Sequence, residues 1–194
     1  MDGDALDLRA YQGDHALVVD EAHSVGALGP DGRGVAAAQG VEPDVVVGTL
    51  GKAYGAYGAF VVGPAPLRDL LLSQGRSFIF TTGLPEPVAA AALQGLRLAT
   101  DERRERLRKN VTRLRCGLAE LDIPALGRHH IVPLLLGAKA MSTANALRKA
   151  GFYVTGIRPP TVAPGGERIR FTLSAEHTAD QIDGLLSALE SLLC

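Results

Sequence analysis

The sequence predicts an α/β fold, and three observations support this expectation. Short apolar runs have the composition of buried parallel strands, at residues 16–20, 44–49 and 59–63. Two stretches that each begin at a proline have helical character, at residues 66–73 and 87–100. Strands that alternate with helices are typical of a layered α/β architecture, so we expect a mostly parallel sheet in the first half of the chain.

The pattern changes from residue 101 onward. The expected elements are a long amphipathic helix to about Leu121, a strand at 131–136, a helix at 142–150, strands at 152–157 and 168–173, and a closing helix at 178–193. Strands and helices in this mixture predict a second, smaller α+β domain. We therefore expect two domains, at residues 1–100 and 101–194.

Composition and charge exclude several classes of protein. Hydrophobic residues make up 46% of the chain and charged residues 21%, which argues against a disordered or fibrous protein. The net charge is -1 and the basic residues form no stripe, so no nucleic-acid partner is expected. No run approaches the roughly 18 apolar residues of a membrane span, and the start lacks the pattern of a targeting segment. A small-molecule partner is favoured.

The cysteine content adds an expectation about location and metals. Cys116 and Cys194 are too few and too far apart to form a disulfide framework or a metal site. We therefore expect no bound metal, and a reducing cytoplasm fits the sequence.

An acidic motif, Asp20-Glu-Ala-His23, stands where the first predicted strand gives way to a glycine-spaced loop ending in Gly32-Arg33-Gly34. Open α/β sheets place their binding sites at such strand ends. The simpler alternative is that acidic residues merely end the strand. A sharper alternative is the magnesium-binding box of a helicase-type NTPase. That class needs the phosphate loop G-x-x-x-x-G-K-[ST], but Val46 and Ala53 stand where it requires glycine and a hydroxyl residue.

Lys52 lies in a glycine-rich segment, residues 48–58, directly after the second predicted strand. Most lysines are solvated surface charges. A lysine with apolar, small-residue flanks can instead act as a Schiff-base nucleophile. The hydroxyl of Thr49, three residues earlier, can reach a phosphate. These features favour a covalent-lysine site.

Together these residues match the needs of one cofactor, pyridoxal 5'-phosphate (PLP). PLP requires a lysine to hold its aldehyde, a carboxylate at its pyridinium nitrogen, and donors for its phenolic oxygen and phosphate. Lys52, Asp20, His23 and Thr49 supply these groups. A carboxylate beside the ring nitrogen favours the protonated form of that nitrogen, which preserves the ring as an electron sink. The combination is more specific than either motif alone.

On these motifs the sequence resembles the α-oxoamine synthases, a branch of the fold-type-I PLP enzymes. The matching residues are Asp20–His23, the Gly32-Arg33-Gly34 turn and the Thr49-x-x-Lys52 segment. The resemblance implies the large domain of a PLP transferase followed by a small C-terminal domain. The segment Phe78-Ile-Phe-Thr-Thr82-Gly-Leu-Pro85 resembles the family segment whose threonine reaches the PLP phosphate of the neighbouring subunit. Thr82 therefore implies a homodimer.

The segment Val154-Thr-Gly-Ile-Arg158-Pro-Pro-Thr161 is most similar to the branch that joins L-alanine to a pimeloyl thioester, with loss of carbon dioxide, in biotin biosynthesis. The resemblance implies that Arg158 and Thr161 bind the substrate. The planar guanidinium of Arg158 would bind both oxygens of a substrate carboxylate. Lys52 would remove the α-proton of alanine, Asp20 would stabilise the electron sink, and His23 would lie against the cofactor. The alternative for Arg158 is a charged residue ahead of a Pro-Pro turn.

The resemblance covers nearly the whole chain, yet the chain matches only the carboxyl-terminal half of the family. The family's glycine-rich phosphate loop and ring-stacking residue have no counterpart in it. We therefore expect a truncated form of a longer enzyme, with apolar sheet faces left uncovered. The remaining alternatives are another α-oxoamine synthase, such as a glycine C-acetyltransferase, and an inactive fragment that serves only in folding or dimerisation.

Overall fold

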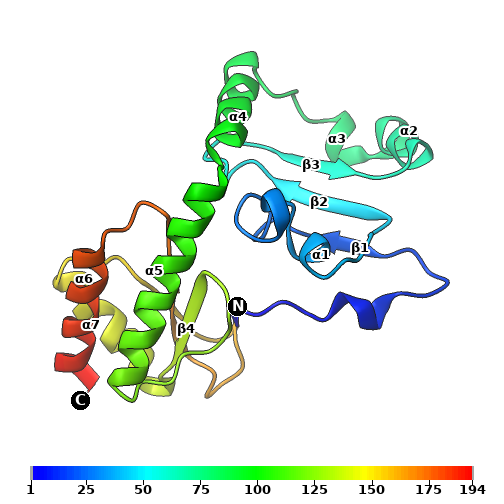
Figure 1. Cartoon of the computed structure of the whole chain (residues 1–194). Coiled ribbons are helices and arrows are strands. Elements are labelled where there is room, and N and C mark those ends of the chain that lie inside the picture. The colour runs from blue at the N-terminus through cyan, green and yellow to red at the C-terminus, as the bar shows by residue number, and fades with distance from the viewer. Residues whose placement is uncertain (1, 194) are drawn as a thin grey trace. The chain divides into compact units, whose positions relative to one another are not determined.

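The computed structural model describes residues 2–193 and divides into two compact units (Figure 1). We call Leu6–Arg104 the lysine unit. The C-terminal unit comprises the chain from Glu105 onward, together with the short segment that ends at Ala5. No helix among residues 2–193 is long and apolar enough to cross a membrane.

The sheet of the lysine unit contains β1 (Val18–Asp20), β2 (Val45–Thr49) and β3 (Ala59–Val62), in that spatial order. β1 and β2 are parallel, as predicted. The prediction of a third parallel strand was wrong, because β3 runs antiparallel to β2. The reason lies in the connection: a parallel return needs a crossover of about a dozen residues or more. The turn between β2 and β3, residues 50–58, is too short for that and forms a hairpin-like return.

The helices of the lysine unit surround this small sheet. They are the short turns η1 (Leu8–Tyr11) and η2 (Pro30–Gly32) and the helices α1 (Val35–Ala38), α2 (Ala65–Gln74), α3 (Arg76–Ile79) and α4 (Glu86–Leu98). α2 and α4 confirm the helices predicted behind prolines. Their prolines occupy the first turn, where a missing backbone N–H costs nothing.

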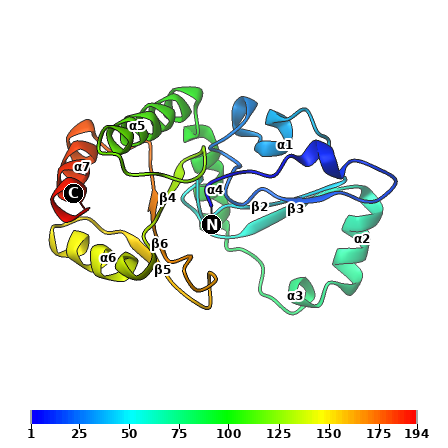
Figure 2. The ribbon, with the colours of Figure 1, turned by 90° about the horizontal axis from the view of Figure 1, so that it is seen from below.

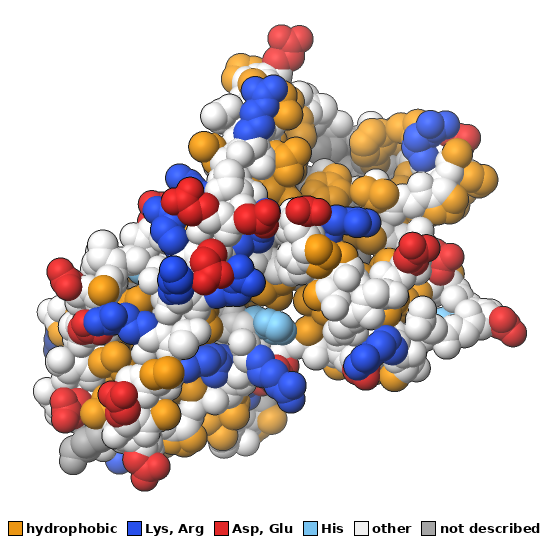
Figure 3. Space-filling view, viewed as in Figure 1, with side chains coloured by type: hydrophobic (Ala, Val, Ile, Leu, Met, Phe, Trp, Pro, Cys, Tyr) orange, Lys and Arg blue, Asp and Glu red, His pale blue; other side chains and the backbone are white. Residues whose placement is uncertain are grey.

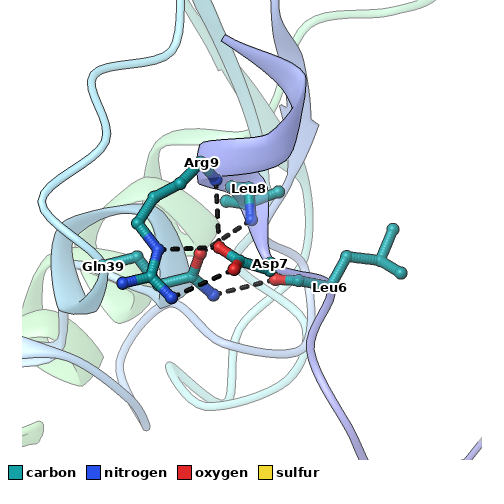
Figure 4. A network of polar contacts seen from close by, with 5 residues as sticks. All are labelled: Leu6, Asp7, Leu8, Arg9 and Gln39. Carbon is teal, nitrogen blue, oxygen red and sulfur yellow. Dashed lines mark hydrogen bonds and ion pairs between the residues drawn. The ribbon is translucent and has the colours of Figure 1, made fainter.

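Gln39 attaches the beginning of the lysine unit to the turn after α1 (Figure 4). Its side-chain Nε2 donates to the Leu6 carbonyl at 2.8 Å, and its Oε1 accepts from the Leu8 N–H at 2.7 Å. Leu8 is thereby held in a small buried cluster with Val19, Ala36 and Val41. Beside this contact, the side-chain hydrogen bond from Arg9 lowers the pKa of Asp7 below its usual range.

We expect Gln39→Ala to lower the free energy of unfolding by about 1 kcal/mol, because two backbone groups lose their partners. Urea unfolding followed by circular dichroism measures this change. Gln12→Ala is the matched control, since Gln12 is an exposed glutamine at the end of η1. Equal stabilities of the two variants would contradict the attachment.

The C-terminal unit is an antiparallel sheet covered by helices. Its strands lie in the order β4 (Ile131–Leu135), β6 (Arg168–Thr172) and β5 (Thr155–Ile157). The helices are α5 (Asp101–Glu120), whose first four residues belong to the lysine unit, α6 (Ala140–Lys149) and α7 (Ala179–Leu193). Figure 2 shows these helices on one face of the sheet.

The core of the C-terminal unit lies between that face of the sheet and its helices. Leu114 and Leu118 of α5, Leu189 of α7 and Ile169 of β6 are fully buried in one apolar cluster. The strands and helices predicted in this half are all present, with ends shifted by a few residues. Their clear periodicity explains this agreement.

Candidate active site

The two candidate motifs leave neighbouring strands at the same edge of the sheet. Asp20 is the last residue of β1 and lies opposite Val47 of β2. Thr49 is the last residue of β2. Because β1 and β2 are parallel, both loops emerge at the carboxyl ends of the strands, where open α/β sheets place their ligands.

Asp20 and His23 are both exposed at this edge. The Oδ1 atom of Asp20 accepts a hydrogen bond from the Ala22 N–H at 2.8 Å, which begins the turn that carries His23. This turn uses one carboxylate oxygen of Asp20 and leaves the negative charge accessible. A carboxylate so placed can pair with a protonated ring nitrogen of a ligand.

Lys52 is exposed in a tight loop that is held by its own hydrogen bonds. The Thr49 hydroxyl donates to the Gly58 carbonyl at 3.1 Å and accepts from the Gly51 N–H at 3.2 Å. The Gly55 N–H donates to the Lys52 carbonyl at 3.0 Å. The Thr49 hydroxyl therefore shapes the lysine loop in this structure. To donate to a phosphate, it would have to turn its one proton away from the Gly58 carbonyl.

The lysine loop packs directly against the loop that follows His23. A Cβ atom added at Gly26 would lie 2.7 Å from the Cβ of Ala53 and 3.1 Å from the Tyr54 ring. Gly26 also has φ +79°, a conformation that L side chains rarely adopt. The two motifs, separated in the sequence, are thus brought together by a contact that only glycine permits.

Helix α4 packs against the lysine loop at Tyr54. A Cβ atom at Gly95 would lie only 2.0 Å from the Tyr54 carbonyl oxygen, so helix and loop are in close backbone contact. Burial raises the pKa of the Tyr54 phenol, an effect that the charge of Arg104 partly opposes. The same helix and loop border an apolar hollow lined by Leu50, Tyr54, Phe60, Ala92, Leu93 and Leu96.

The other predicted site residues lie outside this cluster. Thr82 is exposed in the irregular segment between α3 and α4. Arg158 and Thr161 belong to the C-terminal unit, where they are exposed in the turn after β5. The Thr161 N–H donates to the Arg158 carbonyl at 3.1 Å, which holds that turn. The roles of these residues stay predictions.

The sequence predicts no role for Glu21, which lies between Asp20 and His23 in the acidic motif. It is 1% exposed, in contrast to both neighbours. Its carboxylate accepts hydrogen bonds from the Val35 and Ala36 N–H groups at 2.9 and 2.7 Å. The only sequence signal is position, because successive residues at the end of a strand point to opposite sides.

A parallel strand pair with an acidic loop and a lysine loop at one edge defines a class of site found in PLP-dependent transferases. The chain belongs to the family of class I and II aminotransferases, whose family model matches residues 6–189. Within the curated proteins, it is 47% identical over 205 residues to an 8-amino-7-oxononanoate synthase of Anaeromyxobacter dehalogenans. That alignment covers 100% of this chain and 52% of the relative.

Solved structures show the same fold. A serine palmitoyltransferase of S. paucimobilis, solved with a bound PLP–myriocin aldimine, superposes with a TM-score of 0.90 at 36% identity. It covers 98% of this chain, which matches 52% of that structure. An 8-amino-7-oxononanoate synthase of Francisella tularensis gives a TM-score of 0.78 at 30% identity, over 91% of this chain and 54% of that one.

These comparisons confirm the predicted resemblance and the fold class of the larger domain. They match the chain as a whole, so a separate small domain at residues 101–194 stays a prediction. The chain spans about half the length of the curated relatives it matches. The activity of the whole protein is therefore a matter for proposal.

Proposed function

We propose that this chain carries the lysine-bearing half of a PLP-dependent acyltransferase that makes 8-amino-7-oxononanoate, a step of biotin biosynthesis. Its substrates are L-alanine and a pimeloyl thioester. The observation that carries this proposal is the placement of Asp20 and the Lys52 loop at the carboxyl ends of two adjacent parallel strands. The 47% identity to 8-amino-7-oxononanoate synthases supports the choice of reaction.

The residues at this edge fit PLP. Lys52 is exposed, so its amine is accessible to an aldehyde. Asp20 offers a carboxylate at the end of the neighbouring strand, β1. His23, on the turn after Asp20, would donate to the phenolic oxygen. The Thr49 hydroxyl would donate to the phosphate after turning away from the Gly58 carbonyl. When bound, PLP would supply an electron sink for the electrons of a broken Cα–H or Cα–C bond.

The chain's own residues then have separate tasks. The Lys52 amine would accept the α-proton of L-alanine. The Asp20 carboxylate holds the proton on the ring nitrogen. Arg158 binds the carboxylate of the substrate with its planar fork, assisted by Thr161. The alanine Cα would bond to the acyl carbon as the thiol departs. The carboxyl group would then leave as carbon dioxide, and Cα would take up one proton in its place.

The proposed enzyme is a cytoplasmic homodimer in which Thr82 reaches the PLP phosphate of the neighbouring subunit. Exposed leucines on the lysine unit support pairing with further polypeptide. Figure 3 shows hydrophobic side chains gathered over α2 and α4, where Leu72 is 52% and Leu96 is 56% exposed. A monomer rarely exposes a large contiguous apolar surface to water.

A second candidate is another α-oxoamine synthase. The serine palmitoyltransferase superposes better than the 8-amino-7-oxononanoate synthase of F. tularensis, with TM-scores of 0.90 and 0.78. A glycine C-acetyltransferase belongs to the same group of alternatives. The amino acid that the site accepts distinguishes these candidates.

The test is an absorbance spectrum of the purified chain with added PLP. We expect a visible band from lysine-bound PLP that is lost in Lys52→Ala and kept in Lys109→Ala, an exposed lysine of α5. L-alanine should change the spectrum more than glycine or L-serine does. A preference for glycine or L-serine would favour the second candidate. Absence of the band would show that these residues do not hold PLP by themselves. That result would favour an inactive fragment that serves only in folding or dimerisation.

A further inference from the structure

Glu21 is a buried carboxylate in the acidic motif of the candidate site, and the proposed reaction gives it no task. It is 1% exposed and lies between two exposed residues, Asp20 and His23. Burial of a charge is costly unless hydrogen bonds compensate it. The surroundings of Glu21 provide that compensation.

The carboxylate of Glu21 joins two segments of the lysine unit. Oε1 accepts from the Ala36 N–H at 2.7 Å, and Oε2 accepts from the Val35 N–H at 2.9 Å. The Ser24 hydroxyl also donates to Oε2. The carboxylate thus connects the turn that carries His23 to the first residues of α1.

The backbone of Glu21 is fixed as well. Its N–H donates to the Val47 carbonyl of β2 at 2.8 Å, and its carbonyl accepts from the N–H groups of Ser24 and Val25, both at 2.9 Å. A Cβ atom at Gly34 would lie 2.6 Å from the carboxylate, so the space around Glu21 is closely filled. The peptide groups on either side of Glu21 therefore have little freedom.

We propose that Glu21 is a positioning residue, which fixes the directions in which Asp20 and His23 face the cofactor. This inference rests on the proposal that these two side chains contact PLP. Two bonded oxygens and a bonded backbone N–H hold the turn in one conformation, so Asp20 and His23 are oriented before a ligand arrives. Pre-orientation reduces the ordering that binding would otherwise require.

The test is Glu21→Gln. Glutamine has the same shape, but its NH2 group would oppose one of the two N–H groups of Val35 and Ala36. We expect the ring signals of His23 to shift in the NMR spectrum of the cofactor-free chain, with assignment from His23→Ala. We also expect PLP, titrated by its visible band, to bind about tenfold more weakly.

Two controls separate positioning from stability. Glu42→Gln changes an exposed glutamate of the same unit and should behave as the wild type. Leu67→Ala truncates a half-buried leucine of α2 that lies beside Gly63, just past the end of β3, and shows what loss of stability alone does. If Glu21→Gln matches Leu67→Ala in both the His23 signals and the PLP affinity, Glu21 has only a structural role and the inference is wrong.

If Glu21→Gln does not fold, Ser24→Ala replaces it. This change removes one donor to the carboxylate and keeps those of Val35 and Ala36, so a smaller shift of the His23 signals is expected. Unchanged His23 signals in Ser24→Ala would then overturn the inference. A wild-type chain without a visible band would contradict the proposed function, while the His23 signals would still decide the positioning role of Glu21.

Discussion

Replacing Asp20 by asparagine is expected to leave PLP attached to Lys52 and to slow removal of the α-proton of L-alanine by about 10²–10³-fold, the effect typical of losing one electrostatic partner of a developing charge. The Oδ1 of asparagine can still accept from the Ala22 N–H, so the turn carrying His23 is retained. What is lost is the negative charge that favours a protonated ring nitrogen.

Exchange of the alanine α-proton for deuterium, followed by NMR without an acyl donor, measures this step directly. Asp31→Asn is the matched control. Asp31 is an exposed aspartate of the glycine-spaced loop with φ 52°, and asparagine tolerates this conformation. Wild-type exchange in Asp20→Asn would show that Asp20 does not face the ring nitrogen.

Replacing Gly95 by alanine is expected to destabilise the lysine unit by about 3 kcal/mol or more, because the new methyl group overpacks a rigid contact. Within an ordinary helix the same change would stabilise by about 1 kcal/mol. Here the added Cβ would lie 2.0 Å from the Tyr54 carbonyl oxygen, and a backbone atom cannot move aside as a side chain can. Displacement of Tyr54 would also move the loop that carries Lys52.

Urea unfolding followed by circular dichroism measures the loss of stability. Gly184→Ala provides the comparison, because Gly184 is a helical glycine of α7 whose added Cβ would meet Phe152 at 3.4 Å, an ordinary contact. That variant should be as stable as the wild type or more so. If Gly95→Ala were equally stable, α4 would not be in close contact with the lysine loop.

The sequence allowed the regular elements to be predicted where apolar residues recur over several turns. Ile182, Leu185 and Leu189 of α7 are buried at the helical spacing that predicted this helix. α1 was not predicted, because its four residues are too few to show a period. The direction of β3 was predicted wrongly because apolar composition says nothing about direction, which here follows from the short connection after β2.

The candidate site was predictable in part. Side-chain chemistry indicated Asp20 and Lys52, because together with His23 and Thr49 they match the groups that PLP requires. The part played by Glu21 could not be predicted, since its burial depends on N–H groups of Val35 and Ala36, more than a dozen residues along the chain. Thr82 and Arg158 were indicated by the resemblance alone, and their roles stay predictions.

The position of the site residues within one segment of the chain has a consequence for how such a site is inherited. Asp20, His23, Thr49 and Lys52, and the glycines that let their loops meet, all lie between the start of β1 at Val18 and the end of β3 at Val62. One continuous segment of the chain therefore carries this cluster of groups. Recombination that exchanged whole segments around it could give the same cluster new substrate-binding partners without disturbing its internal geometry.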